Sequence, residues 1–442
     1  MPVFLPDIFL FLLFLFVFGV LLMASPSAVR DAGTSFIGGR IPMWVPVLLG
    51  FLTAVGPIST DIYLPAFPAM EQTFHTSAGN VQFTLSIWFV GLAIGQITVG
   101  PLSDRFGRRS PMLIGNALYA VASAVCAFAP DITTFSIARF VASVGASASL
   151  VIPTACVRDM VPDRNAGARM MSQLVMVMGV VPILAPMLGG LVVEFVSWRI
   201  IFWASAAYGA ICVALILFVL PETLPYDRRV ALSPFTLVTR YVTLIRDRAF
   251  ASHALITAFS TFMSFSYLTA APFVFVQLFH FSPLHFSMLF GFFAVFMIGA
   301  SQVNGLLVGR IDSGKLLMGA ICLSVTGGIL LVAVSLWSAW YAPPAWQPYE
   351  VWLVIAAMLL ALAPTGIIFP NAMMGALADH PSLAGAASAL AGTLQYVLGA
   401  VAGVVVGQFP AESAIPMAGC MCCGAILMFL MGLVRPNRQN VN

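Results

Sequence analysis

The sequence predicts an all-α membrane protein with twelve core transmembrane helices, and three observations lead to this fold class. The 442-residue chain is 61% hydrophobic and only 8% charged, whereas a soluble domain averages about 25% charged residues. From Ile41 onward, apolar runs recur at regular intervals and are long enough, at roughly 20 residues, to cross a bilayer as helices. The basic residues are confined almost entirely to alternate loops. Most of the chain must therefore face lipid or buried protein.

The predicted spans form two sets of six. The first set comprises residues 44–67, 81–102, 110–129, 133–155, 170–193 and 199–220, and the second comprises 251–277, 285–308, 315–337, 351–373, 384–408 and 414–434. A polar segment separates the two sets. The predicted domains are an N-terminal lobe over 41–220, a cytoplasmic central loop over 221–249, a C-terminal lobe over 250–436 and a cytoplasmic tail over 437–442.

Residues 1–40 form an N-terminal apolar extension that precedes this regular pattern. Its apolar run, residues 3–23, is interrupted by Pro6 and Asp7 and lacks the basic segment that begins a secretory signal. Three interpretations stay open: an added helix, a cleaved leader, or an upstream misreading of the start. The sequence alone does not choose among them.

The distribution of positive charge predicts the orientation. The chain has 19 Lys and Arg residues. If the core begins in the cytoplasm, all of them lie in cytoplasmic loops or ends except Arg139, which is within a span, and Arg199, which is outside. Because cytoplasmic loops of membrane proteins are enriched in Lys and Arg, both core termini are predicted to be cytoplasmic.

The most specific motif is the loop between the second and third spans, Gly100-Pro101-Leu102-Ser103-Asp104-Arg105-Phe106-Gly107-Arg108-Arg109. Gly100 and Gly107 permit close approach or a positive φ, and Asp104 is near enough in sequence to pair with an arginine. An ordinary positively charged turn is the alternative. A weaker copy, Gly305–Arg310, follows the eighth span and keeps the Gly, Leu and Arg but loses the Asp. Two such halves indicate a two-lobed transporter with its substrate site between the lobes.

Asp61 is the sole acid within the first core span. An ionisable group there costs at least about 2.5 kcal/mol if it faces lipid, so Asp61 should face the interior. Pro57 and Pro65 should bend the helix around it. A carboxyl in this setting can exchange a proton during transport. A structural Asp at an irregular helix end is the alternative.

Arg139 is the only basic residue within a span. Arginine does not release its proton in proteins, so it needs a partner or a water-filled cavity. Both Asp61 and Arg139 fall in the outer halves of their spans, and we predict that they share a depth and act together in proton coupling. An arginine that reaches to a nearby interface is the alternative.

Further candidates lie in the other spans. The fifth span carries Ala185, Pro186, Gly189 and Gly190, which predict a kinked helix that packs tightly against another. Candidate substrate-cavity residues are Tyr63, Phe265, Tyr267, Asn371 and Gln395. Aromatic core packing and helix-to-helix hydrogen bonds are the alternatives for these. The seven cysteines lie in or beside apolar runs and indicate neither a disulfide framework nor a metal site.

Together these motifs resemble the drug:proton antiporters of the major facilitator superfamily, and most closely the bicyclomycin-resistance (Bcr/CflA) family. The resemblance covers about residues 40–436. Besides the loop motif and the fifth span, it is carried by Ser59–Pro68, Val157–Asp159, Trp198–Trp203 and Phe369–Ala372. Two positions depart from the family pattern: Ala185 stands where Gly is usual before the proline, and Ala142 stands where Gln is usual three residues after the arginine.

The resemblance implies a major facilitator fold and a proton-coupled efflux antiporter that exports small organic compounds, such as antibiotics, across the bacterial inner membrane by alternating access. It implies Asp61 as the proton-carrying carboxyl and Arg139 as the group that tunes it. The predicted conformational clamp comprises Gly100, Asp104, Arg105, Gly107 and Arg108. The expected partners are the substrate, protons and the lipid bilayer, without nucleic acid, and we expect a monomer.

No cofactor or metal is expected, and the proton gradient is the expected energy source, because the chain lacks a nucleotide-binding loop of the G-x-x-x-x-G-K-[ST] type. One alternative is an importer or facilitator of a small metabolite on the same fold. A membrane enzyme or non-transporting receptor is a second, and the five scattered histidines argue against an enzyme. The substrate and the proton stoichiometry are not fixed by the sequence.

Overall fold

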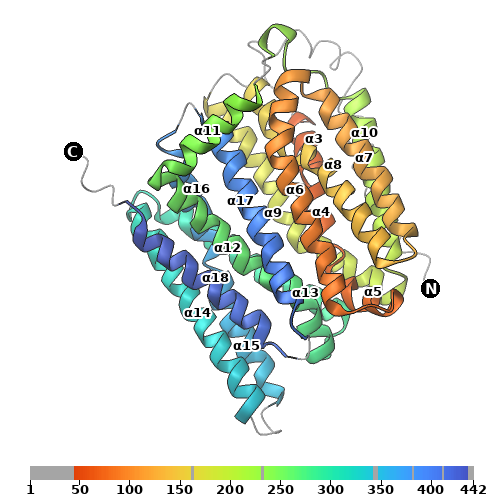
Figure 1. Ribbon diagram of the computed structural model, residues 1–442, viewed down its shortest axis with the longest axis vertical. Coiled ribbons are helices and arrows are strands. Elements are labelled where there is room, and N and C mark those ends of the chain that lie inside the picture. Colours follow the sequence, from red (N-terminus) through yellow and green to blue (C-terminus); the bar gives the residue numbers. More distant parts are fainter. Residues whose placement is uncertain are drawn as a thin grey trace. The chain divides into compact units, whose positions relative to one another are not determined.

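The computed structural model describes residues 44–160, 164–229, 233–341, 347–380, 383–410 and 413–436; for residues 164–169, 171–180, 234, 347 and 348 it describes the backbone alone. The predicted N-terminal extension, 1–40, and the tail, 437–442, lie outside the described residues. Within the described ranges the regular secondary structure is helical, apart from a single bridge between Val308 and Ile311. The predicted all-α class is therefore confirmed (Figure 1).

The first half of the chain contains α3 (Trp44–Thr53), α4 (Val55–Asp61), η1 (Leu64–Ala66), α5 (Phe67–Thr73), α6 (Ala78–Phe106), α7 (Arg109–Phe128), α8 (Ile132–Met160), α9 (Arg164–Phe195) and α10 (Arg199–Phe218). The middle segment contains η2 (Tyr226–Arg228) and α11 (Pro234–Arg246). The second half contains α12 (Arg248–Pro272), η3 (Phe273–Leu278), α13 (Pro283–Leu307), α14 (Ser313–Tyr341), α15 (Gln347–Leu362), α16 (Thr365–Leu377), α17 (Ala384–Gly407) and α18 (Ile415–Val434).

The helices match the predicted spans to within a few residues. Eleven helical stretches among the described residues are long and apolar enough to cross a membrane. The remaining predicted span, 170–193, lies in α9, where Val181–Phe195 is a shorter apolar helix of the described part. Three spans are not continuous α-helices. The first is interrupted at Ala54 and again after Asp61, and the seventh passes from α12 into a π-helical turn at Phe273. The tenth is divided into α15 and α16 before Thr365, at the position that Pro364 occupies.

Sequence signals at helix starts explain where several helices begin. Ser233 caps α11 and Ser282 caps α13, each by accepting a backbone N–H through its hydroxyl, and each is followed by a proline. Proline is favourable in the first turn because its missing N–H would have no helical partner there. The central segment, predicted only as a loop, thus contains a capped helix. Leu244 of α11 is buried in a core cluster with Phe250 and Leu390.

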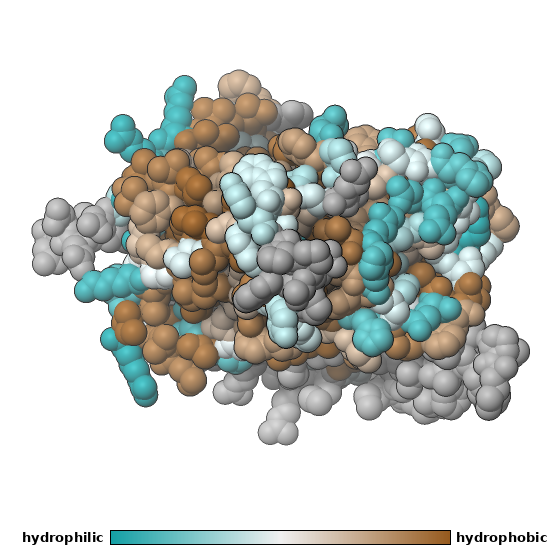
Figure 2. Space-filling view, turned by 90° about the horizontal axis from the view of Figure 1, so that it is seen from below, coloured by the Kyte–Doolittle hydropathy of each residue, from teal (hydrophilic) through white to brown (hydrophobic). Residues whose placement is uncertain are grey.

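The outer surface of the helices is apolar, as a bilayer requires. On α7 a continuous stripe of exposed side chains runs along one face, comprising Ile114, Leu118, Val121, Val125 and Phe128. The opposite face of the same helix is buried. Figure 2 shows hydrophobic side chains over much of the visible surface, with hydrophilic residues gathered in separate patches. Because exposed stripes of this kind would be unfavourable in water, the chain is a multi-pass membrane protein.

The chain divides into two compact units. Unit 1 comprises the described residues of Met1–Ala66 and Ile94–Leu232, and unit 2 comprises those of Phe67–Ala93 and Ser233–Asn442. The units therefore differ from the two predicted six-helix lobes in one segment, Phe67–Ala93, which packs with the second half of the chain. Within unit 2, Figure 1 shows α17, α12, α18 and α14 running alongside one another, in keeping with the packing of α12 on α17 and α18 and of α14 on α18.

Specific contacts hold Phe67–Ala93 within unit 2. The ring of Phe89 stacks on Phe265, with centroids 4.0 Å apart. The amide of Gln277 donates to the carboxylate of Glu71 at 2.6 Å. Ser86 lies against Gly403, where a β-carbon would overlap its hydroxyl. Small residues permit this close approach between helices. The segment Phe67–Ala93 therefore belongs to unit 2 because of its contacts, although it lies in the first half of the sequence.

Candidate functional site

Asp61 lies at a break in the first span. It is the last residue of α4, and the chain continues through η1 before α5 begins. Pro65 falls in this break, within the short 3₁₀-helix η1, where its missing N–H interrupts no α-helix. Asp61 is 7% exposed, and the hydroxyl of Thr60 donates to its Oδ1 at 3.0 Å. The predicted interior position of this carboxyl is thus what the structure shows.

Arg139 of α8 packs against the same break. Its side chain is 2% exposed. Its Nη2 donates to the backbone carbonyl of Ser59 at 3.1 Å, and its Cζ lies 4.3 Å from the ring centroid of Tyr63. A cation over an aromatic face is stabilised by the ring's quadrupole, more strongly in a dry environment. Arg139 therefore contacts the residues two positions before and two positions after Asp61.

A hydrogen bond connects the end of α4, just before the break, to α7. The hydroxyls of Ser59 and Tyr119 lie 2.6 Å apart, and both side chains are buried. Asp61, Arg139 and these two hydroxyls thus form one buried polar cluster in unit 1. We call it the Asp61 cluster: Ser59, Thr60, Asp61, Tyr63, Tyr119 and Arg139.

The antiporter-type residues of α9 form the face that meets this cluster. Ala185, Pro186, Gly189 and Gly190 are all buried, whereas the neighbouring Leu184 is half exposed. At Gly189 a β-carbon would overlap the carbonyl oxygen of Ile62, the residue directly after Asp61. The backbone of α9 therefore touches the break in the first span, and glycine at position 189 is what permits it.

A second polar cluster surrounds Arg108 at the loop motif. The guanidinium donates from Nη1 to Asp104 at 2.5 Å and to Ser103 at 2.8 Å, and from Nε to Asp159 at 2.7 Å. Arg108 itself is 6% exposed. Burial acts to lower the pKa of Arg108, but the hydrogen bonds and charges of Asp159 and Asp104 outweigh it, and the pKa stays above its ordinary value. Arg108 is therefore permanently charged and held between α6, α7 and α8.

Glu222 completes this arrangement from beyond α10. Its carboxylate accepts the backbone N–H of Arg108 at 2.8 Å and that of Arg109 at 3.3 Å, and it pairs with Arg229 at 3.6 Å. Gly107 precedes these donors with φ +89°, a conformation that favours glycine, and a β-carbon there would collide with Glu222. We call this set the Arg108 cluster: Ser103, Asp104, Gly107, Arg108, Asp159, Glu222 and Arg229.

Sequence reasoning identified only part of the Arg108 cluster. In the sequence, Asp159 stands out only as part of the family resemblance, and Glu222 and Arg229 belong to the polar segment 221–249; the acid two residues after the sixth predicted span is the available signal. Of the other two predicted clamp residues, Gly100 joins the cluster through its backbone, since its carbonyl accepts the hydroxyl of Ser103 at 2.8 Å, whereas Arg105 lies apart from the cluster's contacts. The guanidinium of Arg105 lies 5.2 Å from the ring of Phe106, and a β-carbon at Gly100 would meet nothing within 4 Å.

The turn after the eighth span shares one feature with the loop motif, a glycine with a positive φ. Gly107 has φ +89° and Gly309 has φ +90°, and each follows a long helix and precedes the next. Both turns thus use a glycine with a positive φ, although α7 begins two residues after Gly107 and α14 begins four residues after Gly309.

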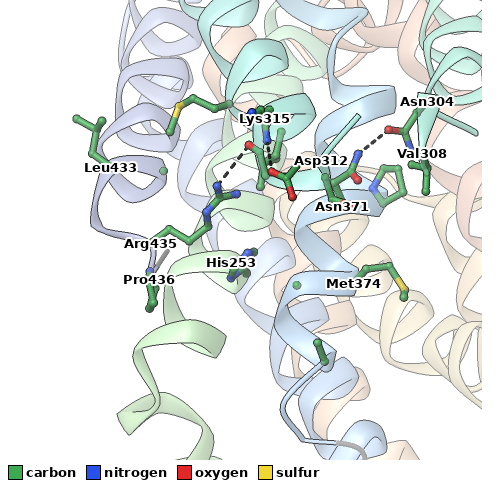
Figure 3. Close-up of a pocket in the computed structure, with 18 residues that line it drawn as sticks. His253, Asn304, Val308, Asp312, Lys315, Asn371, Met374, Leu433, Arg435 and Pro436 are labelled. Carbon is green, nitrogen blue, oxygen red and sulfur yellow. Dashed lines mark hydrogen bonds between the residues drawn. The ribbon is translucent and has the colours of Figure 1, made fainter. Parts of the chain in front are cut away.

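The five candidate cavity residues are distributed over different places. Tyr63 lies under Arg139 in unit 1. In unit 2, Phe265 stacks on Phe89, and Tyr267 stacks on Phe290 at 5.8 Å. Asn371 donates to Asn304 at 2.6 Å and lines a cavity of about 750 Å³, shown in Figure 3. Gln395 is half-buried on α17. Their shared role in substrate binding stays a prediction.

The chain is similar to known proteins over most of its length. The family model described as Major Facilitator Superfamily matches residues 49–404, and the chain belongs to that superfamily. It is 34% identical to an uncharacterized MFS-type transporter, YdgK, of Bacillus subtilis over 88% of this chain and 94% of that protein. It is 27% identical to a bicyclomycin resistance protein homolog of Haemophilus influenzae, over 84% of this chain and 90% of that protein. The resemblance noted from the motifs is thereby confirmed.

The fold is shared with solved transporter structures. A partially occluded inward open conformation of the xylose transporter XylE from E. coli matches with a TM-score of 0.68 at 13% identity, covering 90% of this chain and 98% of that one. At this identity the likeness concerns the fold alone. The matched relatives and structures are transporters, so the chain is a transporter of this superfamily rather than an enzyme.

Proposed function

We propose that this protein is a proton-coupled antiporter that exports small organic compounds, antibiotics among them, across the bacterial inner membrane by alternating access. The observation that carries the proposal is the Asp61 cluster, in which a buried carboxyl lies at a helix break whose neighbouring residues contact Arg139 and the backbone of α9. The relative named for bicyclomycin resistance supports the choice of a drug-like substrate.

Proton exchange follows from the two charge states of Asp61. The deprotonated carboxylate is costly to bury without compensation, whereas the protonated carboxyl is neutral and can donate a hydrogen bond. A ligand shifts a conformational equilibrium only by its differential affinity for the two states. Protonation of Asp61 and binding of substrate would therefore favour different conformations. During the cycle, substrate binding would release the proton, and protonation would release the substrate.

The contacts around Asp61 connect a change in its protonation state to the packing of α8 and α9. Arg139 contacts Ser59 and Tyr63 on either side of the carboxyl, and Gly189 of α9 touches Ile62. A change in the charge of Asp61 that rearranges the break must therefore be accommodated by α8 and α9. We propose that Arg139 positions the turn and favours the charged form of Asp61, and that α9 transmits the rearrangement.

The Arg108 cluster is proposed to act as the conformational clamp on the cytoplasmic side. Its charge-assisted hydrogen bonds connect the end of α6 with the end of α8 and with the segment after α10. Such bonds are strong and directional, so they favour one arrangement of these helix ends. The cytoplasmic placement of this cluster and of both core termini follows from the positive-inside distribution of Lys and Arg. We propose a monomer that uses the proton gradient without a cofactor.

The proposal is tested with inside-out membrane vesicles that carry a pH gradient. Substrates are first chosen from a panel of antibiotics by comparing susceptibility with and without expression of the protein. Substrate-dependent proton release and substrate accumulation are then followed for the wild type and for Asp61→Asn, which cannot release a proton. We expect both signals to be lost in Asp61→Asn.

Asp227→Asn is the matched control, because Asp227 is an exposed acid of η2 and receives the same chemical change. It should behave as wild type. Proton-coupled accumulation at the wild-type rate in Asp61→Asn would exclude Asp61 as the obligatory carrier. Accumulation in the opposite direction, without proton release, would instead indicate the importer or facilitator interpretation.

A further inference from the structure

We propose that α11 binds the surface of the bilayer on the side assigned as cytoplasmic, with one face against the acyl chains and its arginines at anionic lipid headgroups. With 13 residues, this helix is about 20 Å long, too short to cross a hydrocarbon core of about 30 Å. It ends one residue before Arg248, where the membrane span α12 begins. It packs on α12 and α17, and Figure 1 shows it running obliquely across the ends of the helices of unit 2. Its place in the chain therefore puts it beside the membrane surface.

An exposed apolar stripe follows the length of α11. Its side chains are between 40% and 80% exposed, and they are Phe235, Val238, Val242 and Ile245. The intervals of three, four and three residues place all four on one face of a helix. Four large apolar side chains gathered on one face mark a surface that binds another apolar surface.

The rest of the helix has a buried face and an exposed polar flank. Leu244 is buried in the core cluster described above, so α11 is fixed on unit 2. At about 3.6 residues per turn, Thr239, Thr243 and Arg246 fall beside the stripe and not within it, and all three are exposed. Both threonine hydroxyls donate to backbone carbonyls four residues earlier, at 2.9 Å. A helix that is fixed on one face, apolar on the next and polar beyond it suits the boundary between acyl chains and water.

The charges of this segment identify the occupant as a membrane with anionic lipids. Arg240 and Arg246 are the two charged residues in the sequence of α11, and Arg248 begins α12. The acid between them, Asp247, already caps α12 and pairs with His380. Basic residues beside an apolar face strengthen binding to the anionic lipids of a cytoplasmic leaflet. The bilayer that surrounds the spans thus offers a hydrocarbon phase for the stripe and negative charge for the arginines.

The test measures what each exposed side chain of α11 contacts, and it is independent of transport and so of the proposed antiport. Single cysteines are introduced in protein whose exposed native cysteines, Cys322 and Cys423, are replaced by alanine. They are labelled with a nitroxide, and the protein is reconstituted in phosphatidylcholine vesicles with or without phosphatidylglycerol. Electron paramagnetic resonance then compares access of oxygen, which concentrates in hydrocarbon, with access of a nickel chelate, which stays in water. The stripe is tested with Phe235→Cys, Val238→Cys, Val242→Cys and Ile245→Cys, and the matched controls from the polar flank are Thr239→Cys and Thr243→Cys.

Protein without an introduced cysteine gives the background signal, and thermal unfolding shows that each variant is folded. We expect the ratio of oxygen to nickel access to be several-fold higher at the stripe positions than at the two threonine positions. Phosphatidylglycerol should raise the ratio at the stripe further. Arg246→Gln should reduce that rise, whereas Arg310→Gln, at an exposed arginine outside α11, should not.

Two results would overturn the membrane as the occupant. High nickel access at all six positions would show that α11 lies in water. Low access of both reagents at the stripe would show that protein covers it, a second copy of this chain included. A ratio that is the same with and without phosphatidylglycerol would overturn the role of the arginines.

Discussion

The backbone of α9 at Gly189 touches the carbonyl oxygen of Ile62 so closely that a β-carbon has no room between them. Backbone atoms on both sides form this contact, so neither can move aside by rotating a side chain. Ile62 directly follows Asp61, the buried carboxyl to which we assign the proton. The fifth span is therefore coupled to the first at the residue next to the proposed chemistry.

Gly189→Ala should accordingly impair export although alanine is the better helix former. An alanine in a helix interior ordinarily gains about 1 kcal/mol over glycine, but here the added methyl must displace the break after Asp61. We expect export to fall at least tenfold at normal expression, measured as substrate efflux from loaded cells. Gly419→Ala, in α18, is the control because a β-carbon there meets nothing within 4 Å. Wild-type efflux by Gly189→Ala would show that the contact is not required.

Asp104 and Asp159 should contribute unequally to the Arg108 cluster. Both pair with Arg108, but the Asp104 side chain is 42% exposed and that of Asp159 is 15% exposed. Exposed pairs contribute little, roughly 0–1 kcal/mol, whereas removing one partner of a buried pair costs about 3–5 kcal/mol. Asp159→Asn should therefore lower the Tm in detergent more than Asp104→Asn does.

The efflux rates of Asp104→Asn and Asp159→Asn should both fall, although their thermal stabilities differ. If the cluster clamps one conformation, both substitutions should slow efflux, and Asp104→Asn should do so with nearly normal thermal stability. Efflux and Tm are measured on the same preparations. Unchanged efflux in a well-expressed Asp104→Asn protein would contradict the clamp.

A hydrogen bond between Asp247 and His380 predicts a pH-dependent contribution to stability. Asp247 caps α12 by accepting the N–H of Ala249 at 2.9 Å, and His380 Nε2 lies 2.5 Å from its other oxygen. Burial acts to raise the pKa of Asp247, but the bonds from Ala249 and His380 outweigh it and lower the pKa below its ordinary value. The stabilisation is therefore present above the unfolded pKa of about 3.9 and is lost as the pH falls through the lower folded value.

Asp247→Asn should thus lower the Tm at neutral pH, and the difference from wild type should shrink as the pH is lowered below about 4. Thermal unfolding in detergent across this pH series measures it. Asp227→Asn, at an exposed acid, supplies the baseline. A difference that stays constant with pH would mean that the carboxylate charge is not the stabilising feature.

The packing of Ser86 on Gly403 predicts a cross-link that stops transport. Position 403 faces the Ser86 hydroxyl directly, so cysteines at both positions should oxidise to a disulfide. If Phe67–Ala93 must leave this packing during alternating access, oxidised Ser86→Cys/Gly403→Cys protein should lose efflux, and a reducing agent should restore it. Each single variant controls for the native cysteines. Full efflux from the cross-linked protein would show that this packing persists through the cycle.

The sequence predicted what depends on local spacing and composition. Hydropathy defined the spans, and the short interval between Asp104 and the arginines after it indicated an ion pair within the loop motif. The contacts of Arg108 with Asp159 and Glu222 join residues far apart in sequence, and no local pattern marks them. The packing of Phe67–Ala93 in unit 2 was likewise not predictable, since an apolar span does not reveal which neighbour it meets.

The shared backbone conformation of Gly107 and Gly309 separates two reasons for keeping glycine. An L-residue with a β-carbon is disfavoured by roughly 1–2 kcal/mol in a left-handed conformation wherever it occurs. At Gly107 the carboxylate of Glu222 also fills the space that a side chain would need, whereas Gly309 has nothing within 4 Å. Chirality alone constrains position 309, so asparagine, an L-residue that tolerates a positive φ better than most, should be accepted there at a modest cost, while the same residue at 107 would also collide with the glutamate.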